Sequence, residues 1–364
     1  MTTVFAAFSA VLGAIVGSFL NACIHRMPRG ISLSDPKRSF CPSCHKLIPW
    51  HENIPVVSWV ALWGNCSGCG ARISPRYVLV EVFTSACFAA LWLRYGLALA
   101  PAYWILISLL IAATFIDIGH FIIPDEITLG GTVAGVLCCL VLPGLMDTTS
   151  RIAAGGLSLA GAALGAGLLW LVVEGGKLAF GKKKLRFDKA EDFCWVRDGD
   201  RADLRIGGET HRWEDIFSRE SDRLILHPRG PAVCDDGREL PAGPLRFHYN
   251  LLSAGTEKIA LDTIGRISGK LEAVVIPREA MGMGDVKFLA CIGAFLGWQA
   301  VLFTVFSSSI IGCVFGVAGL LIARDKAKAI LPFGPYLALG AALWLFGGRE
   351  LTDWYLSRFQ GGLF

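Results

Sequence analysis

Long apolar runs separated by short polar segments are the feature that most constrains how this chain can fold. We interpret eight of them as helical spans, because about 20 apolar residues suffice to cross the hydrocarbon core of a bilayer. The runs cover approximately residues 3–23, 78–93, 102–116, 127–142, 152–173, 285–297, 301–323 and 331–346, and Pro101 is expected to break the chain between the second and third runs. An apolar share of 54% and a net charge of only +4 favour a multi-pass membrane protein over a soluble or nucleic-acid-binding one.

The positions of lysine and arginine predict which loops face the cytoplasm, because positive loops stay inside. The loop after the first span is rich in them: Arg26, Arg29, Lys37, Arg38 and Lys46. Two later segments carry similar groups: Lys182, Lys183, Lys184 and Arg186, and then Arg324, Lys326 and Lys328. We therefore place these three segments in the cytoplasm and the N-terminus outside. No basic segment precedes the first run, so we expect it to be a retained span.

Composition changes abruptly after the fifth run and predicts an inserted soluble domain. Short β-like pieces at 203–206 and 223–226 alternate with Gly- and Pro-containing turns. The expected fold is an all-α polytopic membrane protein of about eight spans, with a zinc-binding loop and a mostly-β insert. The expected segments are residues 1–25 (first span), 26–77 (cytoplasmic zinc loop), 78–181 (spans two to five), 182–280 (cytoplasmic insert) and 281–364 (spans six to eight).

Four cysteines in the first cytoplasmic loop have the pattern of a zinc site. Cys41 and Cys44 form one CxxC pair, Cys66 and Cys69 form another, and 21 residues lie between the pairs. Two thiolates from each of two tight turns complete a tetrahedron around Zn²⁺, which leaves no coordination position open. The metal would therefore fold the loop and take no part in a reaction. Gly68 and Gly70 would give the second turn its backbone freedom. Two reduced cysteine pairs without metal are the alternative.

Two aspartates at the ends of apolar runs are the candidate catalytic groups. Asp117 ends the run 103–116, and Asp285 follows two glycines, Gly282 and Gly284, at the start of the run 288–298. Acids at the edge of lipid are expensive and so predict function. The topology puts both on the cytoplasmic side, which favours a dyad sharing one proton. Each alone is also explained as a helix N-cap or a solvated end residue.

Neighbouring polar residues have structural explanations. Asp125 follows Pro124 and suits the cap of the fourth span, while Glu81 is expected to pair with Arg76 or another arginine. Lys287 either acts on Asp285 or contacts a lipid headgroup, and nothing in the sequence decides between these. The histidines of the insert are scattered without ligand spacing and predict ordinary surface or core positions; they are His211, His227 and His248.

Glycines in two spans predict close helix packing. Gly13 and Gly17 form a small-xxx-small face in the first span, although ordinary tolerance of glycine in membrane helices explains them equally well. The fifth span, 152–173, is rich in glycine and alanine. We expect a close neighbour along this helix.

Taken together, these motifs resemble those of the type IV prepilin peptidases. The similarity covers most of the chain except the polar insert, and the Gly-x-Gly-Asp element alone also occurs in presenilin-like proteases. The matching elements are Gly17-Ser-Phe-Leu-Asn21 with Arg26 and Pro28, the two CxxC pairs with Asn53-Ile-Pro55 between them, Ile73-Ser-Pro-Arg-Tyr77 with Glu81, Phe115-Ile-Asp117, Ile123-Pro-Asp125, Gly282-Met-Gly-Asp285-Val-Lys287 and Pro332-Phe-Gly-Pro335.

The resemblance implies a bifunctional enzyme of the bacterial inner membrane. Such enzymes cleave the basic leader from type IV prepilins or type II secretion pseudopilins and then methylate the new N-terminus with S-adenosylmethionine. It also implies that Asp117 and Asp285 are the catalytic pair and that the cysteine loop is linked to methylation. The insert at about 182–280 departs from the usual family pattern.

Two other classes would also have several spans and buried acids. A transporter would more often place its acids near the bilayer midplane on broken helices, whereas these acids are at helix ends. A non-catalytic assembly scaffold held by the zinc loop is the second alternative. The partners expected on the peptidase interpretation are prepilin-like substrates and the lipid bilayer, and no nucleic acid.

Overall fold

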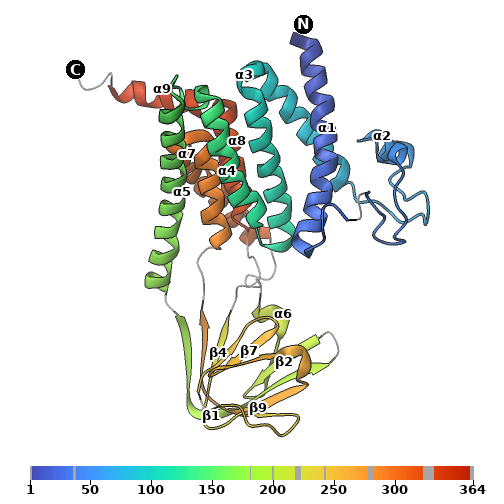
Figure 1. Ribbon diagram of the computed structural model, residues 1–364. Coiled ribbons are helices and arrows are strands. Elements are labelled where there is room, and N and C mark those ends of the chain that lie inside the picture. Colours follow the sequence, from blue (N-terminus) through green and yellow to red (C-terminus); the bar gives the residue numbers. More distant parts are fainter. Residues whose placement is uncertain are drawn as a thin grey trace. The chain divides into compact units, whose positions relative to one another are not determined.

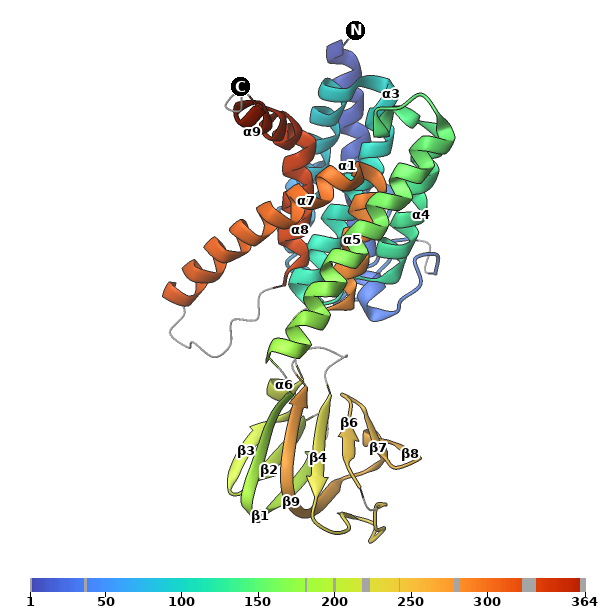
Figure 2. The ribbon, with the colours of Figure 1, turned by 90° about the vertical axis from the view of Figure 1, so that its left-hand side faces the viewer.

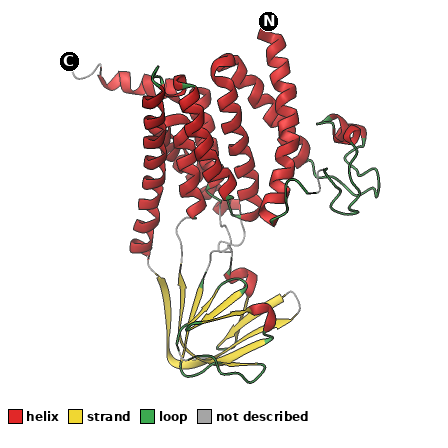
Figure 3. Cartoon of the chain, viewed as in Figure 1, coloured by secondary structure: helices red, strands yellow, loops and turns green. Residues whose placement is uncertain are grey.

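The chain folds into a helical part and a sheet part, which occupy different stretches of the sequence (Figure 3). The computed structural model describes residues 2–35, 38–180, 182–198, 201–217, 223–241, 243–277, 282–322 and 332–360. One compact unit comprises Met1–Trp170 with Met283–Phe364, and the other comprises Leu171–Gly282. Several residues used to predict topology lie outside the described ranges: Lys37, Arg324, Lys326 and Lys328.

Most helices of the described residues follow the apolar runs (Figure 1). They are α1 (Thr2–Arg26), α2 (Val57–Ala61), α3 (Arg76–His120), α4 (Asp125–Val141), α5 (Arg151–Phe180), α6 (Trp213–Ile216), α7 (Met283–Ile322), α8 (Gly334–Leu343) and α9 (Arg349–Gln360). Within these ranges, four stretches are long and apolar enough to cross a membrane: Thr2–Arg29, Arg76–His120, Arg151–Gly176 and Met283–Gly319. The protein is therefore a membrane protein, and the count of eight spans stays a prediction.

The longest helix, α3, is a hairpin of two arms. Trp104 Nε1 donates to the carbonyl of Phe88 at 3.0 Å, although these residues would be about 24 Å apart along a straight helix. The reversal occurs at Gly96, where φ is 61° and ψ is −168°, a conformation that glycine adopts readily. The sequence predicted a break at Pro101, and this is wrong. Pro101 lies inside the second arm, and the reversal needs a positive φ that proline cannot adopt.

A second glycine divides α7 in the same way. Gly297 has φ 77° and ψ −179°, so the helix changes direction between the two predicted runs. The arm after Gly297 packs on α8, where a Cβ added at Gly340 would lie 2.7 Å from the hydroxyl of Ser307. Further along the chain, the ring of Phe303 lies 5.4 Å from that of Trp344. In Figure 2 this arm of α7 extends away from the first one.

Glycines set the spacing between α1 and α3. A Cβ added at Gly13 would lie 2.8 Å from the Cα of Ser85, and one at Gly17 would lie 2.7 Å from the Cα of Glu81. Ser85 also donates its hydroxyl proton to the carbonyl of Ala10 at 2.8 Å. The predicted small-residue face is therefore a real contact surface, and mere tolerance of glycine does not explain it.

The contact between α5 and α7 is closer still. A Cβ added at Gly161 would lie 2.3 Å from the carbonyl oxygen of Gly293, and one at Gly165 would lie 2.5 Å from that of Leu289. The Ser158 hydroxyl donates to the carbonyl of Ala294 at 2.6 Å. This confirms the close neighbour predicted for the fifth run. The packing fixes the first arm of α7, and the first turn of that arm contains Asp285.

The insert is an antiparallel sheet, as predicted (Figure 3). Its nine described strands run in the order β3-β2-β1-β9-β4-β6-β7-β8, with β5 paired to β9. The strands are β1 (Lys182–Asp198), β2 (Arg201–Ile206), β3 (Glu209–Arg212), β4 (Leu224–Pro228), β5 (Val233–Cys234), β6 (Leu245–Phe247), β7 (Leu251–Ala254), β8 (Glu257–Ala260) and β9 (Arg266–Pro277). One face buries a core that includes Phe193, Trp195 and Phe247, so the insert has its own apolar centre.

Helix α9 is one element that the sequence analysis did not predict. It follows α8 after a short π-helical segment, Trp344–Gly348, and it presents Leu351, Trp354 and Tyr355 at the surface. Tryptophan and tyrosine are typical of membrane–water interfaces, where an apolar ring meets a polar surrounding. Because polar residues interrupt its apolar ones, α9 does not form an apolar run in the sequence.

Candidate active site and metal centre

Asp117 lies in the last turn of α3 and is buried, with 5% of its surface exposed. Its Oδ2 accepts a hydrogen bond from the backbone N–H of Gly334, the first residue of α8, at 3.0 Å. A Cβ at Gly334 would lie only 2.6 Å from the same oxygen. The chain therefore places a glycine here because a side chain would displace the carboxyl group.

Asp285 lies in the first turn of α7 and is also buried, at 6% exposure. Gly284, directly before it, faces Ile123, since a Cβ added there would lie 3.5 Å from the Cβ of Ile123. The side chain of Ile123 also reaches the α8 start, where its Cδ1 is 3.0 Å from the added Cβ position at Gly334.

Each acid therefore has a glycine beside it that faces the same residue, Ile123. Asp117 contacts Gly334, Asp285 follows Gly284, and Ile123 touches both glycine positions. Three helix ends converge there: the end of α3 and the starts of α7 and α8. The structure brings together segments that are far apart in the sequence, and a direct sharing of one proton by the two acids stays a prediction.

The nearby polar residues are paired in ways that the sequence did not predict. Lys287 Nζ lies 2.7 Å from Asp125 Oδ1, in an ion pair whose side chains are 35% and 59% exposed. Asp125 is the first residue of α4, and Pro124 occupies the cap position without a side-chain cap, so the predicted capping role of Asp125 is wrong. Its carboxylate instead joins α4 to α7.

The four cysteines of the first loop converge on one point. Their Sγ atoms all lie within 4.8 Å of one another, and those of Cys41 and Cys69 are 3.9 Å apart. Thiolates around Zn²⁺ at about 2.3 Å in a tetrahedron would be about 3.8 Å apart, so the cluster has the size of a four-thiolate zinc site. The donor set and the geometry both fit this metal.

Each cysteine pair lies on the same kind of turn. The N–H of His45 donates to the Cys41 carbonyl at 2.8 Å, and the N–H of Gly70 donates to that of Cys66 at 2.9 Å. These turn residues have φ of 57° and 70°. The predicted backbone freedom is thus used at Gly70. Gly68 has another reason, because a Cβ there would lie 2.8 Å from the Lys46 side chain.

Backbone amides within the turns favour thiolates. Hydrogen bonds from the backbone N–H groups of Cys44 and Ser43 lower the pKa of Cys41 to about 6, against some opposition from burial. The N–H groups of Cys69 and Gly68 lower the pKa of Cys66 in the same way. The neighbouring thiols of Cys44, Cys66 and Cys41 instead raise the pKa of Cys69 to about 11. Because a metal binds the deprotonated thiol, a cation would be needed for all four cysteines to be thiolates together.

Buried polar side chains fasten this loop to the helices. Glu81, buried in α3, accepts a hydrogen bond from the backbone N–H of Val56 at 2.7 Å. Among the described residues this contact replaces the pairing with Arg76 that the sequence predicted. Asn21 Nδ2 donates to the carbonyl of Tyr77 at 2.9 Å. Glu81 and Asn21 thus attach the loop to the helices before and after the second cysteine pair, Cys66 and Cys69.

Arg26 is a structural residue as well as a basic one. Its guanidinium donates to the carbonyls of Ser32, Leu33 and Arg38 at 2.9–3.3 Å, and only 4% of the residue is exposed. It also lies over the ring of Phe40 at 5.5 Å. The sequence marked Arg26 as a topology signal and as part of a family motif, and the structure adds that its guanidinium holds three backbone carbonyls at the start of the loop.

Sequence reasoning missed the roles of Gly334 and Ile123. Both residues belong to motifs quoted for the family resemblance: Gly334 begins α8, and Ile123 lies between α3 and α4. The motifs therefore marked these positions, but nothing in the sequence indicated what the residues do there. It also missed His248, which the structure places beside three cations in the insert. The alternation of polar and apolar residues along the strand could have indicated that His248 and these cations share one face of the sheet.

Two family models match most of the chain. The family model for the bacterial peptidase A24 N-terminal domain matches residues 11–95, and that of the type IV leader peptidase family matches residues 104–186 and 244–317. The interruption between 187 and 243 lies within the sheet unit. No solved structure matches the chain.

Curated relatives extend the match over most of the chain. A prepilin leader peptidase/N-methyltransferase of Aeromonas salmonicida is 28% identical over 372 residues, covering 94% of this chain and 91% of the relative. One of Pseudomonas aeruginosa is 27% identical over 373 residues, covering 95% and 92%. One of Myxococcus xanthus is 47% identical over 145 residues, covering 39% and 42%. The chain contains both cysteine pairs and both aspartates, and these matches cover most of its length. It therefore belongs to the type IV leader peptidase family of enzymes.

Proposed function

We propose that this enzyme removes the basic leader from type IV prepilins or type II secretion pseudopilins and then methylates the new N-terminal residue. The names of the relatives support both activities. The observation that carries the peptidase proposal is the burial of Asp117 and Asp285 at the ends of separate helices, next to two glycines, Gly334 and Gly284, that both face Ile123.

The two acids would act as a general acid and a general base. Two carboxyl groups at one site do not both ionise easily, so one would remain protonated. The ionised member would take a proton from water as the water attacks the scissile carbonyl. The protonated member would polarise that carbonyl and later donate to the leaving amine. The Gly334 N–H would hold the Asp117 carboxyl in orientation, and either acid could be the base.

The substrate would approach as a membrane helix. Its apolar segment would remain among the lipid-facing helices, while its positive leader would stay in the cytoplasm, where we place the acids. Gly282 and Gly284 would let the substrate backbone approach Asp285, because glycine has no side chain to exclude it. The site would thus face the cytoplasm in the bacterial inner membrane.

Zinc and S-adenosylmethionine are the implied accessory groups. Cys41, Cys44, Cys66 and Cys69 would hold one Zn²⁺, which would fold the loop and supply no reactive position because all four ligands are protein thiolates. S-Adenosylmethionine would supply the methyl group in the second reaction. We assign no residues to its binding.

Conservative acid-to-amide variants test the dyad. We expect Asp117→Asn and Asp285→Asn each to reduce leader cleavage of a purified prepilin by more than about 1,000-fold, because each removes one of two proton-transfer groups. Melting temperature and zinc content should stay near those of the wild type. Cleavage is followed by the mass of the product and its new N-terminus.

Asp125→Asn is the matched control. Asp125 is also an acid near Asp117 in the sequence, at the first position of α4, but it is exposed and pairs with Lys287. We expect it to retain cleavage within about threefold, as is usual for surface substitutions. Full leader removal by either variant of the buried acids would reject the proposal and would return attention to a scaffold or a transporter. Methyl transfer to a precleaved pilin peptide measures the second activity separately.

A further inference from the structure

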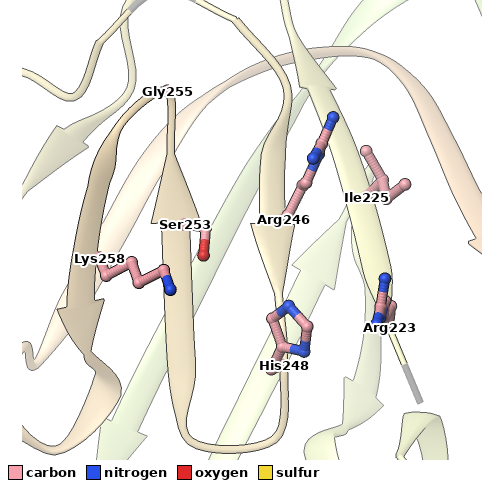
Figure 4. A pocket seen from close by; sticks show the side chains of 7 residues that line it. All are labelled: Arg223, Ile225, Arg246, His248, Ser253, Gly255 and Lys258. Carbon is pink, nitrogen blue, oxygen red and sulfur yellow. The ribbon is translucent and has the colours of Figure 1, made fainter. Parts of the chain in front are cut away.

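A pocket lined by cations lies on the sheet of the insert and contains none of the residues proposed for the peptidase. It has a volume of about 440 Å³. Figure 4 shows its side chains, which come from β4, β6, β7, β8 and the turns next to them. The lining residues are Arg223, Ile225, Arg246, His248, Ser253, Gly255 and Lys258.

The register of the strands explains why these residues meet. Ile225 pairs with Arg246, Arg246 with Ser253, and Ser253 with Lys258, so one row crosses four strands. Leu224 pairs with Phe247, which brings Arg223 and His248 together in the next row. Since side chains alternate between faces along a strand, both rows point to the same side of the sheet.

The opposite face is the apolar core of the insert. The residues between the pocket residues are buried there: Leu224, Leu245, Phe247 and Leu252. This alternation fixes the basic side chains on the outer face, because a one-residue slip would expose the core and bury the charges. The pocket is therefore built by the same register that builds the fold.

The described lining of the pocket is positively charged. Arg223, Arg246 and Lys258 are permanent cations, and none of the described lining residues is a carboxylate. Within the described residues, Glu257 is the acid next to Lys258, but it pairs with Arg238 at 2.6 Å on the strand's other side. Burial, with Arg223 and Lys258 nearby, lowers the pKa of His248, which agrees with a positive local field.

The lining suits a phosphate group. Arginine forks match phosphate oxygens, and lysine adds a point charge. Ser253 supplies a hydroxyl donor, and Ile225 supplies an apolar strip for a carbon skeleton beside the phosphate. Three like charges in one pocket repel one another, so a dianionic or diester ligand would relieve this repulsion.

We propose that this pocket of the insert binds the phosphate group of an anionic ligand, either a phospholipid headgroup or a free phosphorylated solute. The insert is joined covalently at both ends to apolar helices, so both sources are available. This proposal is independent of leader cleavage, and its failure would leave the peptidase assignment unchanged.

The test uses the full chain in nanodiscs made only of phosphatidylcholine. Inorganic phosphate and glycerol 3-phosphate are titrated by calorimetry at constant ionic strength, set with potassium chloride. In a second arm, phosphatidylglycerol replaces part of the phosphatidylcholine, and hydrogen exchange of the segment 245–258 is compared. Heat of binding in the first arm assigns a free solute, whereas added protection only in the second assigns a lipid headgroup.

The variant Arg223→Gln/Arg246→Gln should lose at least about tenfold in phosphate affinity or abolish the added protection, because two charge-assisted contacts disappear. Arg238→Gln is the matched control, since this arginine belongs to the same domain, is paired with Glu257 and does not line the pocket. No binding in either arm, or equal binding by the double variant and the wild type, would overturn the proposal.

Discussion

The cysteine loop and the pair of buried acids are assembled in opposite ways. Cys41 and Cys69 are 28 positions apart, and turns of a few residues present all four thiols. Asp117 and Asp285 are 168 positions apart, and the insert lies between them. The glycines beside them, Gly334 and Gly284, face the same residue, Ile123, where three helix ends meet. A local site therefore depends on turn chemistry, whereas a distant one depends on packing throughout the helical unit.

The residues that maintain each site differ accordingly. The loop depends on backbone hydrogen bonds, on the left-handed φ of His45 and Gly70, and on the expected metal. The acids depend on glycines that allow backbones to touch, such as Gly161 against Gly293. Changes at these positions should separate local damage from damage that spreads through the helices.

Removing a metal ligand should have the largest local effect. We expect Cys66→Ser to weaken zinc binding by more than about 100-fold, beyond the 10–100-fold typical of losing an outer-shell partner. Metal content measured by mass spectrometry after dialysis against a chelator checks this. Cys313→Ser is the control, since this exposed thiol lies on α7 outside the cluster. Equal zinc content in wild type and Cys66→Ser would show that the cluster is not the metal site.

Gly334→Ala should damage the acid site with little effect on folding. The added methyl would lie 2.6 Å from Asp117 Oδ2, and a small displacement of a catalytic group can cost about 100-fold in rate. We therefore expect kcat for leader cleavage to fall by about 10- to 100-fold at nearly constant melting temperature. In Gly119→Ala, the added methyl meets no atom within 4 Å, and its rate should stay close to that of wild type.

Gly161→Val should destabilise the packing of α5 against α7 without touching the cysteines or the two aspartates. Its Cβ would collide with the backbone of α7, where no side chain can move aside, so the two helices must separate. Overpacking usually costs about 1–3 kcal/mol, and we expect a loss of stability of at least this size in thermal unfolding. Gly167→Val on the same helix has open space and is the control. Zinc content should remain normal in both variants, and its loss in Gly161→Val would contradict the independence of the two sites.

Of these changes, loss of the exposed ion pair between Arg94 and Glu350 should have the smallest effect on stability. Arg94 pairs with Glu350 of α9, and their side chains are 32% and 61% exposed. Exposed pairs contribute about 0.2–1 kcal/mol, so Arg94→Ala should lower stability by no more than this and leave cleavage and zinc unchanged. Thermal unfolding with the double variant Arg94→Ala/Glu350→Ala measures the coupling directly. A coupling above about 2 kcal/mol would show that α9 is fastened much more firmly than the surface geometry indicates.

The sequence alone determined the membrane character, the cysteine cluster and the β character of the insert. These properties depend on runs, spacings and alternation between residues close together in the chain, which a reader of the sequence can count. It also identified Asp117 and Asp285 as candidates, because acids at the edge of lipid need a reason to be there.

Tertiary structure decided what lies beside each of these residues. It reversed α3 at Gly96 instead of Pro101, turned Asp125 toward Lys287, gave Glu81 the Val56 amide, and seated Asp117 on the Gly334 N–H. It also placed His248 among the cations of the insert. The physical reason is that such contacts depend on how closely helices approach and on which strands pair. Those distances are set by the packing of the whole unit, and no local pattern records them.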